Sequence, residues 1–217
     1  MKNKTVLNRF FLAQVMLSLM ILLLSTRFYL HGKNEQMCVL ILLLKATGLF
    51  TSWTLMLGSL HAPFFERFCP KNPHFDCHRV IESPAGTIFN LIHTADMGVL
   101  YFGGSALTML LSAFTPHFYH NIILLAFVNL LALPYTLFSV AYQALVVKKW
   151  CALCLIVQAI FWLEFWQFFP YLFQNPIRLQ LTLDHIGPFA LGFGLPLSLW
   201  PLLRHLVEKA YPSHQDP

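Results

Sequence analysis

Six long apolar stretches constrain what this chain of 217 residues can fold into. A helix needs about 20 mostly apolar residues to cross a bilayer, and inside lipid every backbone polar group must be satisfied within its own segment. The stretches cover residues 10–30, 38–60, about 87–113, about 119–147, 151–173 and about 185–207. Charged residues make up only 11% of the chain, against roughly 25% in soluble domains. The sequence therefore predicts an all-α integral membrane protein.

The stretches at the two ends of the chain are less regular than the others. Stretch 10–30 follows Lys2, Lys4 and Arg9, as a signal peptide would, but no small-residue cleavage site follows it. We therefore interpret it as an uncleaved membrane helix. The last stretch contains prolines at 188, 196 and 201, which weaken it as a helix.

One polar connection, 61–86, is much longer than the others and carries two of the five cysteines, Cys69 and Cys77. Two more, Cys151 and Cys154, form a CxxC at the start of stretch 151–173. Two membrane crossings separate the pairs, so we expect both pairs at the same membrane surface. The chain has no basic cluster with interleaved aromatic residues, which argues against nucleic-acid binding.

The position of the CxxC favours a reactive dithiol. Free N–H groups and the helix dipole at a helix N-terminus favour a thiolate, and Lys148 and Lys149 add positive charge just before it. A spacing of three places both sulfurs on one helix face. We expect Cys154 to lie one turn deeper in the membrane and Cys151 to stay nearer water.

Other interpretations of these cysteines remain open at this point. A structural disulfide or an inert pair would explain one couple. Tetrahedral zinc sites also use CxxC pairs, but a spacing of eight between Cys69 and Cys77 suits such a site poorly. His74 and His78 would enlarge a metal site, although loop histidines are usually solvated. We assign no metal ligands, and we interpret Cys38 as a small buried hydrophobe.

The combined pattern resembles the vitamin K epoxide reductase family. The loop reads "FCPKNPHFDCHRVIESP", with Ser83 six residues after the second cysteine, and "WCALCLIVQ" follows two spans later. "DCHRVIESP" followed by "MGVLYFGGS" is most similar to the bacterial disulfide-forming branch. The resemblance covers about 45–173.

The resemblance implies a role for each of these positions. Cys69 and Cys77 match the shuttle pair, which exchanges disulfides with a thioredoxin-like protein. Cys151 and Cys154 match the active-site pair beside a membrane quinone, ubiquinone or menaquinone, and Ser83 matches a loop serine near the quinone pocket.

The family also implies a division of the chain. A four-helix redox core, linked to the quinone, would occupy 38–173, with an extra N-terminal membrane helix in 1–37 and a further helix and short tail in 174–217. Many bacterial members carry a fused thioredoxin-like domain after the last helix, and this sequence shows none. We therefore expect a separate thioredoxin-like partner.

The sequence departs from the family at the quinone site. Animal members have tyrosine four residues beyond the second CxxC cysteine, where this chain has Gln158. An amide there would either bind a quinone carbonyl or make a polar contact between helices. The asparagine that caps the quinone in animal members has no clear match, which weakens the case for vitamin K epoxide as substrate.

The sequence-based expectation is an enzyme that oxidises thiols and reduces a quinone, generating protein disulfides. Asp96, His93 and Glu164 are candidates for proton relay, with snorkelling to the interface as the rival interpretation. A metal-binding or redox-sensing membrane protein that uses the same cysteines is the alternative function. A purely structural anchor is a third, and it predicts dispensable cysteines.

Two arguments predict opposite orientations of the chain in the membrane. With six spans, ten Lys and Arg residues lie on the cysteine side and three on the other, and the positive-inside rule then places the cysteines in the cytoplasm. The family resemblance places them outside, in the compartment where disulfides persist. If 10–30 does not cross, the count becomes seven against six. We expect a bacterial inner-membrane protein with an extracytoplasmic active side.

Overall fold

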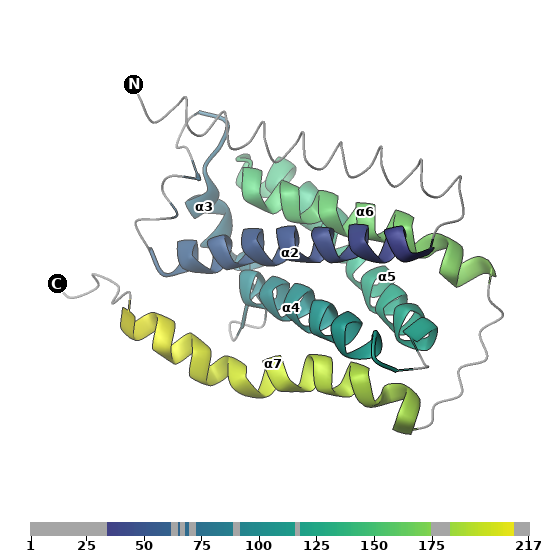
Figure 1. The fold of residues 1–217 in the computed structure, drawn as a ribbon. Coiled ribbons are helices and arrows are strands. Elements are labelled where there is room, and N and C mark those ends of the chain that lie inside the picture. Colours follow the sequence, from purple (N-terminus) through teal and green to yellow (C-terminus); the bar gives the residue numbers. More distant parts are fainter. Residues whose placement is uncertain are drawn as a thin grey trace.

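The computed structural model describes residues 34–61, 65, 68–69, 73–88, 92–115, 118–174 and 183–210 (Figure 1). The predicted membrane helix at 10–30 lies outside these residues. The long helices are α2 (Asn34–Ser59), α4 (Thr94–Ser112), α5 (Phe118–Tyr142), α6 (Ala152–Gln174) and α7 (Leu183–Ala210). The prediction of an all-α membrane fold is confirmed.

Four of the described helices are long and apolar enough to cross a membrane: Cys38–Ser59, Phe118–Val147, Ala152–Pro170 and Ile186–Ala210. The protein is therefore a multi-pass membrane protein. Helix α4 is not among these four, and it carries buried polar side chains, among them Asp96, Ser105 and Thr108. These side chains face neighbouring helices, so the helix does not need the hydropathy of a lipid-facing segment.

The predicted four-helix core is formed by α2, α4, α5 and α6. Helix α2 packs on α4 and α6, and α5 packs on α6 and α4. Helix α7 lies along α4 on the outside of this bundle, as Figure 1 shows.

The docking of α7 depends on small residues at the contact. A Cβ on Gly192 of α7 would lie 2.1 Å from Thr108 Oγ1, and one on Gly104 of α4 would lie 2.8 Å from Phe193. Arg204 of α7 also pairs with Asp96, at 2.6 Å. Helix α7 continues through its three prolines, which neighbouring helices make tolerable at membrane depth.

The long polar connection folds over one end of the bundle. It contains α3 (Cys77–Ile81), the short 3-10 helix η2 (Pro84–Gly86), and the strands β1 (Thr87–Ile88) and β2 (Ile92–His93). The strands pair antiparallel, with Thr87 opposite His93. The third predicted stretch, about 87–113, was therefore placed too early, because its first residues form this hairpin and α4 begins at Thr94.

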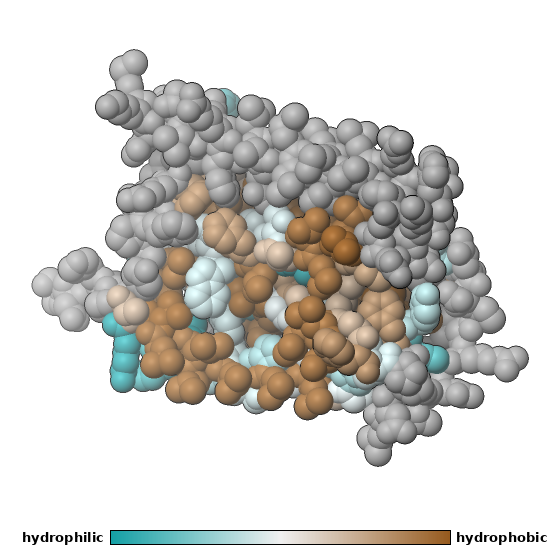
Figure 2. Space-filling view, viewed as in Figure 1, coloured by the Kyte–Doolittle hydropathy of each residue, from teal (hydrophilic) through white to brown (hydrophobic). Residues whose placement is uncertain are grey.

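Buried apolar residues form two clusters along the bundle. The first contains Met56, Phe102 and Ile160 together with Cys69, Cys77 and Cys151. The second contains Ile41, Ile122 and Phe168, and Cys38 packs against it. Large apolar side chains are also exposed, as on α7 at Leu195, Leu202 and Leu206. Figure 2 shows apolar side chains gathered over this face of the described helices, as expected of a surface in lipid.

Candidate active site

Cys69 and Cys77 form a disulfide, with a Cα–Cα distance of 5.9 Å. Cys77 is the first residue of α3, whose N-cap is Asp76; the Asp76 carboxylate accepts from the Arg79 N–H at 3.2 Å. The Cys77 N–H donates to Cys69 Sγ at 3.1 Å. Both side chains are buried.

The disulfide-bearing loop is tied to the CxxC by backbone pairing. Phe75 and Trp150 form a parallel bridge. The Asp76 N–H donates to the Trp150 carbonyl, and the Trp150 N–H donates to the His74 carbonyl, both at 3.0 Å. The two cysteine pairs therefore lie at the same end of the bundle, as the count of membrane crossings predicts.

Lys149 adds a side-chain tie at the same place, because its ammonium donates to the Pro73 carbonyl. We predicted that Lys149 serves as a thiolate stabiliser. The structure gives it a contact with the loop backbone, which holds the loop against the CxxC segment.

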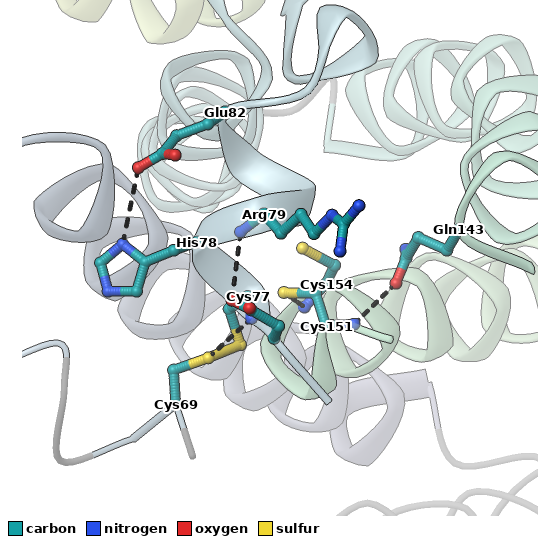
Figure 3. Close-up of a disulfide and its surroundings, with 9 residues drawn as sticks. Cys69, Cys77, His78, Arg79, Glu82, Gln143, Cys151 and Cys154 are labelled. Atoms are coloured by element: carbon teal, nitrogen blue, oxygen red, sulfur yellow. Dashed lines mark hydrogen bonds and ion pairs between the residues drawn. A yellow bond between two sulfur atoms is a disulfide. The ribbon is translucent and has the colours of Figure 1, made fainter. Parts of the chain in front are cut away.

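Cys151 lies directly before α6, and Cys154 lies in its first turn (Figure 3). Both thiols are free. The Cys154 N–H donates to Cys151 Sγ at 3.2 Å, and an N–H at a helix start stabilises a thiolate. The Cys151 N–H donates to Gln143 Oε1 at 2.8 Å. Gln143 belongs to η3 (Gln143–Val147), a π-helical turn that ends α5, and such turns are frequent at functional sites.

We expected Cys151 to stay nearer water than Cys154, but within the protein Cys151 is the more buried of the two. Its side chain is 0% exposed, and the preceding residue, Trp150, pairs with Phe75 of the disulfide-bearing loop. Cys151 instead belongs to the same core cluster as Cys69 and Cys77, and Figure 3 shows the disulfide beside the two thiols.

A pocket lies between α2, α4, α5 and α6 next to this cluster, and Cys154, Ser83 and Gln158 all line it. Three positions singled out in the sequence thus come together around one cavity. Cys69, Cys77 and Cys151 are not among its lining residues. Apolar side chains supply much of the wall: Leu55, Val80, Ile81, Val157 and Phe161.

Two polar atoms in this pocket are buried without a hydrogen-bond partner among the described residues: Ser52 Oγ and Gln158 Oε1. The Gln158 amide Nε2 donates to Ser139 Oγ at 2.7 Å, which joins α6 to α5. A hydroxyl and an amide oxygen left open between apolar walls suit a flat apolar ring with polar oxygens at its rim. The chemistry of this lining therefore suits an apolar electron carrier with oxygen atoms at its rim.

Several pocket residues were missed in the sequence, namely Ser52, Tyr135, Ser139, Tyr142 and Gln143. A signal for four of them was present. Residues 135, 139 and 142 repeat at intervals of four and three within an apolar stretch, and residue 143 lies four beyond 139, which places polar side chains along one helix face. Ser52 has no such signal, because hydroxyl residues are common throughout its helix.

The candidates for proton relay have different surroundings from those expected. Asp96 is ion-paired with Arg204 of α7. Glu164 is fully buried and pairs with Lys45 at 2.7 Å, so it does not snorkel to the interface. None of Asp96, His93 and Glu164 lines the pocket.

The fold and this end of the bundle define a class of protein: a multi-pass membrane protein whose dithiol separates a loop disulfide from an apolar pocket. A family model described as the vitamin K epoxide reductase family matches residues 39–169, from α2 through most of α6. The chain belongs to that family and is a membrane oxidoreductase. No curated protein and no solved structure matches the chain.

Proposed function

We propose that the protein oxidises the thiols of a separate thioredoxin-like partner and passes the electrons to a membrane quinone, so that protein disulfides are generated. Electrons would enter at Cys69 and Cys77 and leave from Cys151 and Cys154. The observation that carries this proposal is the position of the CxxC: Cys151 is packed with the loop disulfide, while Cys154 forms part of the pocket wall.

The exchange between the two couples follows from their order in space. A reduced partner attacks the Cys69–Cys77 disulfide and leaves with its own disulfide, which gives two thiols in the loop. The Cys77 thiolate then attacks Cys151 of a Cys151–Cys154 disulfide and releases Cys154 as a thiolate. Cys69 next attacks Cys77, which restores the loop disulfide and releases Cys151.

The Cys154 N–H, which points at Cys151 Sγ, makes Cys151 a better leaving group, because a stabilised thiolate leaves faster. This sequence of exchanges ends with a loop disulfide and two CxxC thiols. That is the arrangement of sulfurs in the structure.

The pocket residues would hold the electron acceptor against Cys154. A quinone bound there accepts two electrons and two protons while the two CxxC thiols become a disulfide. In this proposal the Ser52 hydroxyl would donate to a carbonyl oxygen at the ring, and Gln158 Oε1, which like it is buried without a partner among the described residues, would accept from a hydroxyl. Ubiquinone and menaquinone both present such oxygens.

We further propose that the protein lies in a bacterial inner membrane with this end on the extracytoplasmic side, where newly formed disulfides persist. The alternative of a metal-binding or redox-sensing protein that uses all four cysteines has less support. A disulfide between Cys69 and Cys77 leaves only two thiols for a metal.

Anaerobic assay of purified protein tests the proposal. Ubiquinone or menaquinone analogues are added with dithiothreitol or a thioredoxin-like donor, and quinone absorbance is followed. We expect reduction by the wild type and by Cys38→Ala, which leaves both pairs intact, and none by Cys154→Ala. Wild-type rates in Cys154→Ala would overturn the proposal, as would a wild type that reduces no quinone.

A further inference from the structure

Three metal-ligating side chains meet beside the loop disulfide. His61 follows the end of α2, His78 comes directly after Cys77 in α3, and Glu82 caps the end of α3. Their ligating atoms all lie within 4.8 Å of one another. Glu82 Oε1 is 3.8 Å from His61 Nε2 and 3.8 Å from His78 Nδ1. Figure 3 shows the His78 ring and the Glu82 carboxylate facing each other.

The fold orients these side chains toward a common point. His78 and Glu82 are four residues apart, a spacing that brings their side chains to one helix face. The His61 and His78 rings are parallel within 5°, with centroids 5.8 Å apart. The edge of Phe65 packs on His78, and that contact restrains its ring. His61 has a φ of 53°, an uncommon backbone conformation in which histidine is enriched.

Two imidazole nitrogens and a carboxylate oxygen are a common ligand set for zinc with an open fourth position. Zinc–ligand bonds of about 2.0–2.2 Å require the three atoms to close by less than about 1.5 Å. The His61 and Glu82 side chains are 51% and 55% exposed, so both have room to make this movement. We propose that His61, His78 and Glu82 form a site for a divalent transition metal of the zinc type, with water in the remaining position.

The place of this site in the chain indicates what a metal would do there, and this step rests on the proposed function. The Cys69–Cys77 disulfide closes the loop after α2, and that bond opens in each reaction cycle. A metal held by His61, His78 and Glu82 closes the same loop from outside, and its ligands are not redox-active. The metal would therefore keep Cys77 near Cys151 while the disulfide is reduced.

The binding test uses the full-length protein in detergent micelles, with Cys38, Cys151 and Cys154 replaced by serine. This thiol-free background keeps the loop disulfide and removes every thiolate that would compete for metal. Zn²⁺ binding is measured by calorimetry, and Co²⁺ absorption reports the ligand geometry. We expect one Zn²⁺ per chain.

The ligand variants are His61→Ala and Glu82→Gln, both at exposed positions. Each should weaken Zn²⁺ binding by at least about tenfold, since loss of a second-shell partner alone costs that much. His74→Ala is the matched control, because it removes an exposed histidine of the same loop outside the cluster, and its affinity should not change. Absence of saturable binding, or equal affinity in all variants, would overturn the site.

The clamp role has a separate readout. In a protein with Cys69→Ser and Cys77→Ser, Zn²⁺ should slow trypsin cleavage within 62–79, and His61→Ala should abolish this protection. Equal cleavage with and without Zn²⁺ would overturn the clamp even if the metal binds. Neither measurement involves quinone, so failure here is distinguishable from failure of the proposed electron transfer.

Discussion

Cys154 occupies the position at which thiol chemistry meets the pocket, and its removal should stop the reaction at a defined step. In Cys154→Ala, Cys151 keeps its place beside the loop cysteines but has lost the thiol with which it forms a disulfide. In the double variant Cys69→Ala, Cys154→Ala no thiol is left to resolve the mixed disulfide, and under oxidising conditions we expect a Cys77–Cys151 disulfide to accumulate. Non-reducing digestion followed by mass spectrometry identifies it, and recovery of Cys77 and Cys151 as two free thiols in the double variant would contradict the exchange route.

Gln158 makes a helix contact through one end of its amide and faces the pocket with the other, so the two roles can be separated by mutation. Gln158→Leu removes both, whereas Ser139→Ala removes the acceptor on α5 and leaves the Gln158 amide in the pocket. One hydrogen bond contributes about 0.5–1.5 kcal/mol, and we expect Gln158→Leu to raise the KM for quinone by up to about tenfold. Ser139→Ala should raise it much less; an equal rise would mean that helix packing alone explains Gln158.

At the scale of elements, one polar cluster joins all four core helices. Lys45 of α2, Tyr101 of α4 and Asn129 of α5 all contact Glu164 of α6. Lys45 Nζ and the Tyr101 hydroxyl each lie 2.7 Å from Glu164 Oε2, and the Asn129 amide donates to it at 3.3 Å. All four side chains are buried. Their mutual contacts fix the register of the four helices.

Replacing one charged residue of this cluster should lower the free energy of unfolding more than replacing both. Lys45→Met leaves a carboxylate buried without its cation, and the loss of one partner of a buried pair costs about 3–5 kcal/mol. We expect that decrease in the free energy of unfolding, measured by SDS titration in mixed micelles. The double variant Lys45→Met, Glu164→Leu removes both charges and should recover most of it. No recovery would show that the cluster contributes through packing and not through charge.

The sequence predicted elements and motifs well because these depend on local pattern. Apolar length revealed α2, α5, α6 and α7, and the cysteine spacing identified the family. The start of α4 was misplaced, since apolar content does not distinguish a short hairpin from the first turns of a helix. A single cation and a single anion in apolar stretches must find partners. Which residues pair, here Lys45 with Glu164, depends on helix packing.

Contacts that arise only from the packing of helices also explain why part of the site was not predicted. Cys154, Ser83 and Gln158 were found because each lies at a fixed distance from a cysteine motif. Ser52 belongs to another helix and reaches the pocket only through the fold. Cys151 is buried beside the pairing of Phe75 with Trp150, which are 75 residues apart in the chain, and no local pattern shows it.

For the whole molecule, the structure weakens the argument from charge about how the protein is oriented in the membrane. Among the basic residues on the cysteine side that the structure describes, Arg204 pairs with Asp96, and Lys149 donates to Pro73. Their positions follow from packing at this end of the bundle. They therefore say less about topology than free loop charges do, which weakens the argument for a cytoplasmic active side.

The orientation can be measured with one exposed thiol at each end of the bundle. Arg79 is exposed on α3 at the cysteine end, and Phe114, 90% exposed, lies in the turn between α4 and α5 at the other end. Each is replaced by cysteine in the thiol-free background, and intact cells are treated with a membrane-impermeant maleimide. If disulfides are made outside the cytoplasm, Arg79→Cys labels before lysis and Phe114→Cys only after it. The reverse pattern would place the active side in the cytoplasm, where the positive-inside rule puts it.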